Sequence, residues 1–133
     1  MILISHRGNT NGVNDTQENN PEYLKLAIDK GFKVEMDISY SPYQKKLLFA
    51  HENTGLQFPF DEDFLYQNKE NLLIHCKDIE SLCFFRGKVG QFNFFFHENS
   101  DFTVSSLGWI IAHSKVTGDI LEKYKTEMVQ MLP

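Results

Sequence analysis

The sequence predicts an α/β protein built on parallel strands. Its first elements follow the order strand, helix, strand, at 2–5, from 21 to just before 31, and at 32–40. A strand joined to the next strand by a crossover helix is parallel to it, and the crossover is normally right-handed. The run at 2–5 is continuously apolar rather than alternating, which is typical of a strand covered on both faces.

Local signals support these elements and extend them. The segment 9–20 is rich in Asn, Gly and Thr and predicts an exposed loop. Asn20 is a suitable N-cap, and Pro21 suits the first helical position. Apolar and polar residues alternate along 32–40, so Glu35 and Asp37 share one face of that strand. A turn at 41–44 then precedes a returning strand at 46–50, which ends at His51.

The second half of the chain is expected to continue with strands and fewer helices. Its predicted elements are a strand at 71–74, a helix at 78–88, a strand at 91–96, a hairpin that pairs 102–104 with 109–112, a helix at 119–125 and a strand at 128–132. No internal repeat of 20–50 residues is present beyond this alternation.

Composition limits the class of protein. The chain of 133 residues suits a single domain over 1–133, and its net charge of −5, without a basic stripe, makes nucleic acid an unexpected partner. The apolar stretches are too short for a membrane span or a signal peptide. Cys76 and Cys83 lack a CxxC spacing, so we expect buried free thiols and a cytoplasmic protein.

Polar side chains gather at the predicted strand ends. They are His6 and Arg7 after the first strand, Glu35 and Asp37 on the second, His51 after its return, His75 and Lys77 after the third, and His97 after the fourth. Ligands of parallel α/β folds bind at the carboxyl ends of the strands, so we predict a site there. His113, by contrast, is interpreted as an ordinary structural histidine.

The paired carboxylates indicate a metal. Glu35 and Asp37 can share one cation, although an Arg or Lys partner or a solvated edge strand would also explain them. The histidines at neighbouring strand ends favour the metal. Arg7 and Lys77 then either bind an anionic group or form salt bridges with the carboxylates. An anionic substrate, a metal and two imidazoles together predict phosphodiester cleavage.

Four motifs in the first half of the chain resemble the glycerophosphodiester phosphodiesterases of the phosphatidylinositol phospholipase C-like superfamily. These motifs are Ile4-Ser5-His6-Arg7-Gly8, Gln17-Glu18-Asn19, Val34-Glu35-Met36-Asp37 and Phe49-Ala50-His51. The resemblance implies a parallel-strand TIM-type (β/α) barrel, with His6 and His51 as general acid and base and Arg7 on the phosphate. It also implies Mg²⁺ or Ca²⁺ on Glu35 and Asp37, Glu18 as a supporting residue, and Lys77 at the position of the family lysine.

Two departures from that family change the prediction. His75 stands where the family has a further metal-binding Glu, and an imidazole ligand favours Mn²⁺ or Zn²⁺. This form, with His97 after the next strand, is similar to a shorter branch of the superfamily. A complete barrel needs about 250 residues, so the expected barrel is reduced or incomplete. Its open edges would be covered in a homo-oligomer.

The predicted function is a metal-dependent phosphodiester hydrolase that acts on a small, glycerophosphodiester-like substrate by histidine general acid and base catalysis. The alternative is a non-catalytic module that binds sugar phosphates or other anions on a degenerate barrel. A third hypothesis is an isomerase or lyase of a sugar phosphate, since the same groups could abstract a proton.

Overall fold

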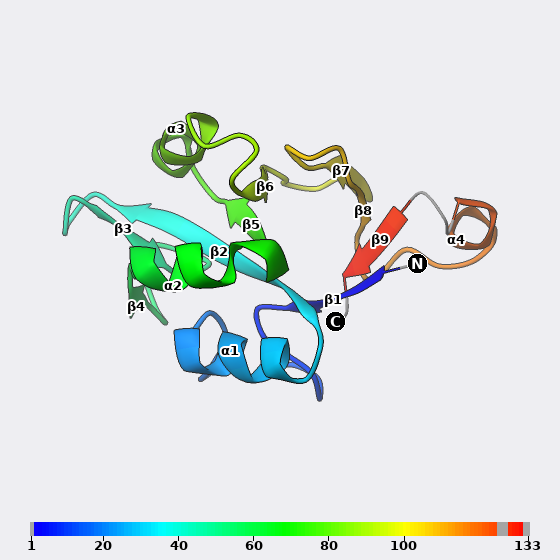
Figure 1. The fold of residues 1–133 in the computed structure, drawn as a ribbon, viewed down its shortest axis with the longest axis horizontal. Helices are drawn as coiled ribbons and strands as arrows, with labels where there is room; N and C mark the ends of the chain where they lie inside the picture. Colours follow the sequence, from blue (N-terminus) through cyan, green and yellow to red (C-terminus); the bar gives the residue numbers. More distant parts are fainter. Residues whose placement is uncertain (1, 125–127, 132–133) are drawn as a thin grey trace.

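The structure is a computed structural model that describes residues 2–124 and 128–131. Within these residues, nine strands form one mixed sheet that curls into a half-barrel, accompanied by four short α-helices (Figure 1). The strands are β1 (Ile2–His6), β2 (Lys33–Ser41), β3 (Lys46–Phe49), β4 (Phe58–Pro59), β5 (Leu72–Cys76), β6 (Asn93–Phe95), β7 (Phe102–Val104), β8 (Ile110–Ala112) and β9 (Met128–Met131). The helices are α1 (Pro21–Asp29), α2 (Glu62–Asn68), α3 (Ile79–Arg86) and α4 (Asp119–Tyr124), with a 3₁₀ turn at Lys69–Asn71.

The long strand β2 organises the sheet. It pairs in parallel with β1 along one edge and with β5 along the other, while β9 and β8 continue the sheet beyond β1, and β6 continues it beyond β5. The antiparallel pairs are β2 with β3, β3 with β4, and β7 with β8. The register sets His6 opposite Glu35, and Asp37 opposite His75. The strand pairing itself therefore assembles much of the predicted site.

The predicted parallel TIM-type (β/α) barrel, reduced or incomplete, is wrong. The sheet is mixed, the fold is dominated by strands, and the connection from β6 to β8 runs through β7 rather than through a helix. In a (β/α)₈ barrel every strand is parallel and a helix follows each one. Here the chain instead uses hairpins, such as the turn at Lys45 with φ of 54° that returns β2 as β3. A hairpin needs only a few residues, whereas a parallel crossover needs a dozen or more.

Local capping explains where the helices begin. The Asn20 side chain accepts a hydrogen bond from the Glu22 amide, and Pro21 occupies the first turn of α1, as the sequence predicts. Helix α3 begins with a capping box in which Asp78 and Ser81 satisfy each other's backbone amides. The sequence prediction missed α2 and β4. The predicted ends at Lys125 and Leu132 lie outside the described residues.

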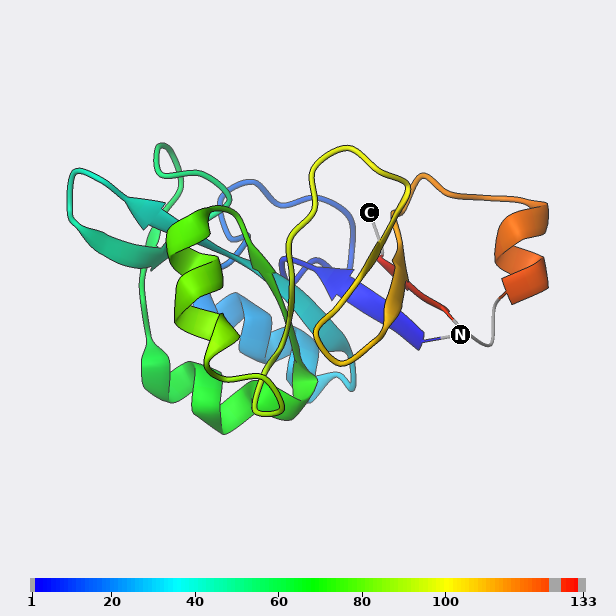
Figure 2. The same ribbon diagram turned by 90° about the horizontal axis from the view of Figure 1, so that it is seen from above.

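Two apolar layers lie on opposite faces of the sheet. On one face, side chains of β2, β5 and β6 pack against α1, α2 and α3, and Met36, Ile74 and Phe85 are fully buried there. On the inner side of the curl, Ile4, Leu73, Phe95, Ile111, Val129 and Met131 form a second, smaller cluster. Figure 2 shows α4 lying apart from α1, α2 and α3.

The two cysteines have different environments, and both are free thiols. Cys76 is fully buried in β5, and this burial raises the pKa of its thiol to about 12. Cys83 is exposed on α3, so the expectation that both thiols are buried holds only for Cys76. None of the described helices is long and apolar enough to cross a membrane.

Candidate functional site

Four histidines follow the inner apolar cluster along their strands. Each comes two residues after one of its members, and residues two apart in an extended strand point to the same face. The pairs are Ile4 and His6, Leu73 and His75, Phe95 and His97, and Ile111 and His113. The side chains of the inner apolar cluster therefore lie below the four imidazoles, which are placed at the ends of the strands.

One cavity collects these side chains. It has a volume of about 260 Å³, which suits a small ligand. The cavity is lined by all five histidines of the chain together with Arg7, Glu35 and Lys77. The cavity thus brings together seven of the nine predicted site residues, all except Asp37 and Glu18, and it adds His113. The signal for His113 was the same apolar-x-His spacing that the other three strands carry.

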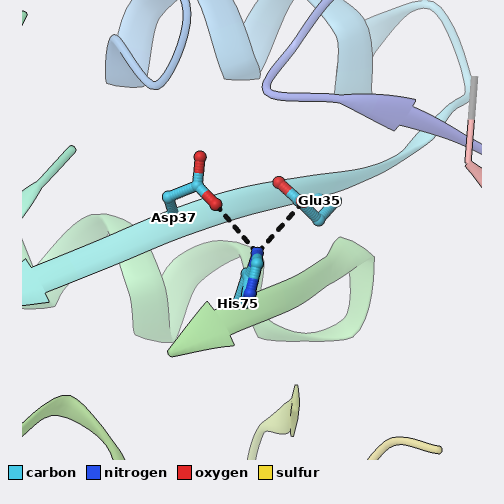
Figure 3. A group of neighbouring side chains, drawn as sticks. All are labelled: Glu35, Asp37 and His75. Carbon is cyan, nitrogen blue, oxygen red and sulfur yellow. Dashed lines mark ion pairs between the residues drawn. The ribbon is translucent and has the colours of Figure 1, made fainter. Parts of the chain in front are cut away.

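Glu35, Asp37 and His75 form the candidate metal centre. The two carboxylates extend from one face of β2, and the imidazole reaches toward them from β5 (Figure 3). The Nδ1 atom of His75 lies 3.1 Å from Asp37 Oδ1 and 3.9 Å from Glu35 Oε2. One ligand atom from each residue lies within 4.8 Å of the other two. A single cation can therefore contact all three side chains.

The orientation of His75 is fixed by its other contacts. Its Nε2 lies 3.1 Å from the carbonyl oxygen of His97, which can only accept a hydrogen bond, so Nε2 carries a proton. Its ring also stacks on Phe95, with a centroid distance of 4.6 Å. With Nε2 engaged in this way, Nδ1 is the ring nitrogen that faces the two carboxylates. Metal-binding histidines commonly donate their second N–H to a backbone carbonyl in the same manner.

The two carboxylates of this centre are buried. Among the residues that the structure describes, both carboxylate oxygens of Glu35 are buried without a hydrogen-bond donor, and Oδ1 of Asp37 is buried with the His75 ring as its neighbour. The two residues are only 1% and 0% exposed. Burying a carboxylate without compensation is strongly unfavourable. Two carboxylates and one imidazole nitrogen are a suitable ligand set for a divalent cation, so the residues present fit a metal.

The two carboxylates differ electrostatically. Burial, followed by repulsion from Asp37, raises the pKa of Glu35 well above its usual range. Burial also acts to raise the pKa of Asp37, but the hydrogen bond from His75 and the charge of Arg7 outweigh it and hold that pKa well below its usual range. Arg7 and His75 thus satisfy Asp37 and leave Glu35 undercompensated. A bound cation would relieve this imbalance.

Arg7 and Asn19 hold Asp37 from the loop side. Both adopt a left-handed backbone conformation, with φ of 56° and 69°. Arg7 Nε lies 2.8 Å from Asp37 Oδ2. The Asn19 side-chain amide donates a hydrogen bond of 3.0 Å to the same oxygen. Its Oδ1 accepts a hydrogen bond of 2.8 Å from the backbone amide of Asp37. The sequence prediction missed Asn19, although Asn is among the few residues that readily adopt positive φ.

Glu18 supports Arg7 at the rim of the site. One of its carboxylate oxygens lies 3.4 Å from Arg7 Nη1, and the other accepts a hydrogen bond of 2.6 Å from the Asn9 side chain. Glu18 lines a neighbouring cavity of about 240 Å³. This cavity shares Arg7 and His51 with the cavity that is lined by the five histidines. The sequence left open whether Arg7 binds an anionic group or forms a salt bridge with a carboxylate. Arg7 forms the salt bridge with Asp37, and it also lines the cavity of the five histidines.

His6 and His51 are both shifted toward the neutral form. Burial, followed by the charge of Arg7, lowers the pKa of His6 to about 4, although its Nε2 lies 3.6 Å from Glu35 Oε2. Burial and Arg7 also lower the pKa of His51, whose Nε2 accepts a hydrogen bond of 3.4 Å from Lys77 Nζ. In the metal-free protein both rings are therefore predominantly neutral at pH 7, and a neutral imidazole can accept a proton.

Comparisons with protein-family models, with curated proteins and with solved structures find no match for this chain. The resemblance drawn from the four sequence motifs therefore stays a prediction.

Proposed function

We propose that the protein is a metal-dependent phosphodiester hydrolase that acts on a small substrate by histidine general acid and base catalysis. The observation that carries this proposal is the composition of one cavity. The cavity contains two imidazoles with lowered pKa values and the cationic side chains of Arg7 and Lys77, and two members of a buried ligand set for a divalent cation, Glu35 and His75, line its wall. The glycerophosphodiester-like substrate class is taken from the sequence resemblance alone.

Glu35, Asp37 and His75 would hold the cation. A bound divalent cation would act as a Lewis acid on a phosphoryl oxygen. The nitrogen ligand favours Mn²⁺ or Zn²⁺ over Mg²⁺ or Ca²⁺, which prefer all-oxygen sites. Supporting contacts come from the His97 carbonyl, which orients His75, and from Glu18, which holds Arg7.

The remaining side chains would carry out the chemistry on the phosphodiester. Arg7 and Lys77 stabilise negative charge that develops on the phosphoryl oxygens. A hydroxyl of the substrate or a water molecule attacks phosphorus, and its proton passes to one of the two imidazoles. The bond from phosphorus to the leaving alcohol breaks, and the leaving oxygen receives a proton from the other imidazole, whose protonated form is favoured by the negative charge of the phosphodiester bound beside it. His6 and His51 line the cavity, and one of them serves as the general base while the other serves as the general acid.

Metal restoration tests this function. Purified protein is treated with a chelator and assayed with bis(p-nitrophenyl) phosphate and with glycerophosphodiesters, before and after single additions of Mg²⁺, Ca²⁺, Mn²⁺ or Zn²⁺. We expect chelation to remove nearly all hydrolysis and Mn²⁺ or Zn²⁺ to restore it best. A folded protein that binds inorganic phosphate but hydrolyses nothing with any of the four ions would contradict the proposal and identify an anion-binding module instead.

A further inference from the structure

His113 has no part in the proposed reaction, yet it lines the same cavity as His6, His51 and His75. It directly follows β8, on the opposite side of β1 and β9 from the metal centre. His113 also lies near enough to His6 to add, after burial and Arg7, to the lowering of the pKa of His6. This placement indicates that His113 can contact a ligand in the cavity, whereas the sequence analysis interpreted it as a structural histidine.

The hydrogen bonding of His113 defines which ring nitrogen carries the proton. The backbone amide of Lys115 donates to His113 Nδ1 at 3.3 Å. Because that amide can only donate, Nδ1 must be unprotonated, and the neutral ring carries its proton on Nε2. Neutral His113 is therefore a hydrogen-bond donor through Nε2. It is a poor metal ligand in this state, because its only lone pair is already used by the Lys115 amide.

The backbone around His113 is held in place on both sides. Its own amide donates to the Asp101 carbonyl at 2.9 Å, and its carbonyl accepts from the Val116 amide at 2.9 Å. Its ring stacks on that of His97 with a centroid distance of 6.2 Å and an interplanar angle of 30°. A donor that is fixed before the ligand arrives loses little conformational entropy on binding.

We propose that His113 contacts the substrate and donates a hydrogen bond from Nε2 to a phosphoryl oxygen of the bound phosphodiester. This inference depends on the proposed function, because it assigns the ligand of that same cavity. Arg7 and Glu35 define the β1 and β2 side of the cavity, and His113 supplies a neutral donor from the β8 side. Arg7 and His113 would then bind the phosphate from two sides.

Two substitutions test the role of His113. His113→Leu removes the donor, whereas His113→Gln keeps an amide N–H near the position of Nε2. We expect His113→Leu to lower kcat/KM for bis(p-nitrophenyl) phosphate by about 10-fold to 100-fold, somewhat less than the loss of a fully enclosed oxyanion donor. His113→Gln should stay within about threefold of the wild-type value. Lys115→Ala is the matched control, since it keeps the backbone amide and should leave kcat/KM unchanged.

Binding measurements separate this inference from the proposed function. The affinity of the Mn²⁺-loaded protein for inorganic phosphate is measured by calorimetry in the same variants, so the test remains valid if the wild type does not hydrolyse phosphodiesters. We expect weaker phosphate binding in His113→Leu, near-normal binding in His113→Gln, and unchanged Mn²⁺ affinity in both. Equal behaviour of the two variants, whether both match the wild type or both are impaired to the same extent, would overturn the inference.

Discussion

Replacing Glu35 with Gln is expected to reduce the affinity for Mn²⁺ or Zn²⁺ by about 100-fold or more, because the substitution removes one of three protein ligands. Glutamine keeps the size of the side chain but has no negative charge. Isothermal titration of the chelator-treated protein measures this loss directly. Hydrolysis should fall together with metal affinity, since the reaction is proposed to need the cation.

The same substitution should have the opposite effect on the metal-free protein. Burial and the neighbouring Asp37 raise the pKa of Glu35, so its ionised form opposes folding when no cation is bound. A carboxyl whose pKa is raised in the folded state favours folding less as pH rises above its unfolded value. At pH 8 we therefore expect metal-free Glu35→Gln to be more stable than the wild type by about 1–3 kcal/mol. Added metal should raise the Tm of the wild type but not that of Glu35→Gln.

The matched control for this prediction is Glu62→Gln, which changes the same residue type on the exposed first turn of α2. It should alter neither metal affinity nor the response of the Tm to metal. Wild-type metal affinity should also rise with pH, because the cation competes with a proton on Glu35. Unchanged metal affinity in Glu35→Gln would contradict the assignment of this carboxylate as a ligand.

Replacing His6 with Asn is expected to lower kcat by about 10²-fold to 10⁴-fold, the usual contribution of a general acid or base. The amide side chain remains polar beside Glu35 but cannot exchange a proton near neutral pH. Metal affinity should stay near the wild-type value, which separates a loss of chemistry from a loss of the cation. The measurement is single-turnover hydrolysis of bis(p-nitrophenyl) phosphate with saturating Mn²⁺.

A combined substitution sharpens this result. If His6 and His51 act in one reaction, changing both to Asn should cost much less than the product of the two single effects. Full activity in His6→Asn, with the metal bound, would exclude His6 from the reaction.

The candidate site was predictable where strand periodicity alone determines it. The alternation along β2 places Glu35 and Asp37 on one face, and the structure confirms that both are buried there. His113 was missed because the hairpin at 102–112 was not interpreted as part of the same sheet. Its β8 strand joins the parallel arrangement only through β9, and no local sequence signal reports such a long-range pairing.

The fold class could not be derived in the same way. The βαβ unit at the N-terminus was correctly predicted to be parallel, and β1 and β2 pair in that manner. The prediction failed when that unit was extended to a whole barrel, because strand and helix signals do not state which strands become neighbours. Asn19 was missed for a related reason, since its role follows from a positive φ and from contact with a strand 18 residues away.

The most direct test of the proposed metal centre is the ¹⁵N spectrum of the His75 side chain while Zn²⁺ is added to the chelator-treated protein. We expect Nε2 to stay protonated throughout, because it donates to the His97 carbonyl, and the Nδ1 signal to move to the position of a metal-bound nitrogen at one equivalent of Zn²⁺. The shift should be absent in Glu35→Gln at the same Zn²⁺ concentration. If His75 remains doubly protonated and its Nδ1 signal does not respond to Zn²⁺, the ring is only an ion-pair partner of Asp37, and the metal centre is wrong.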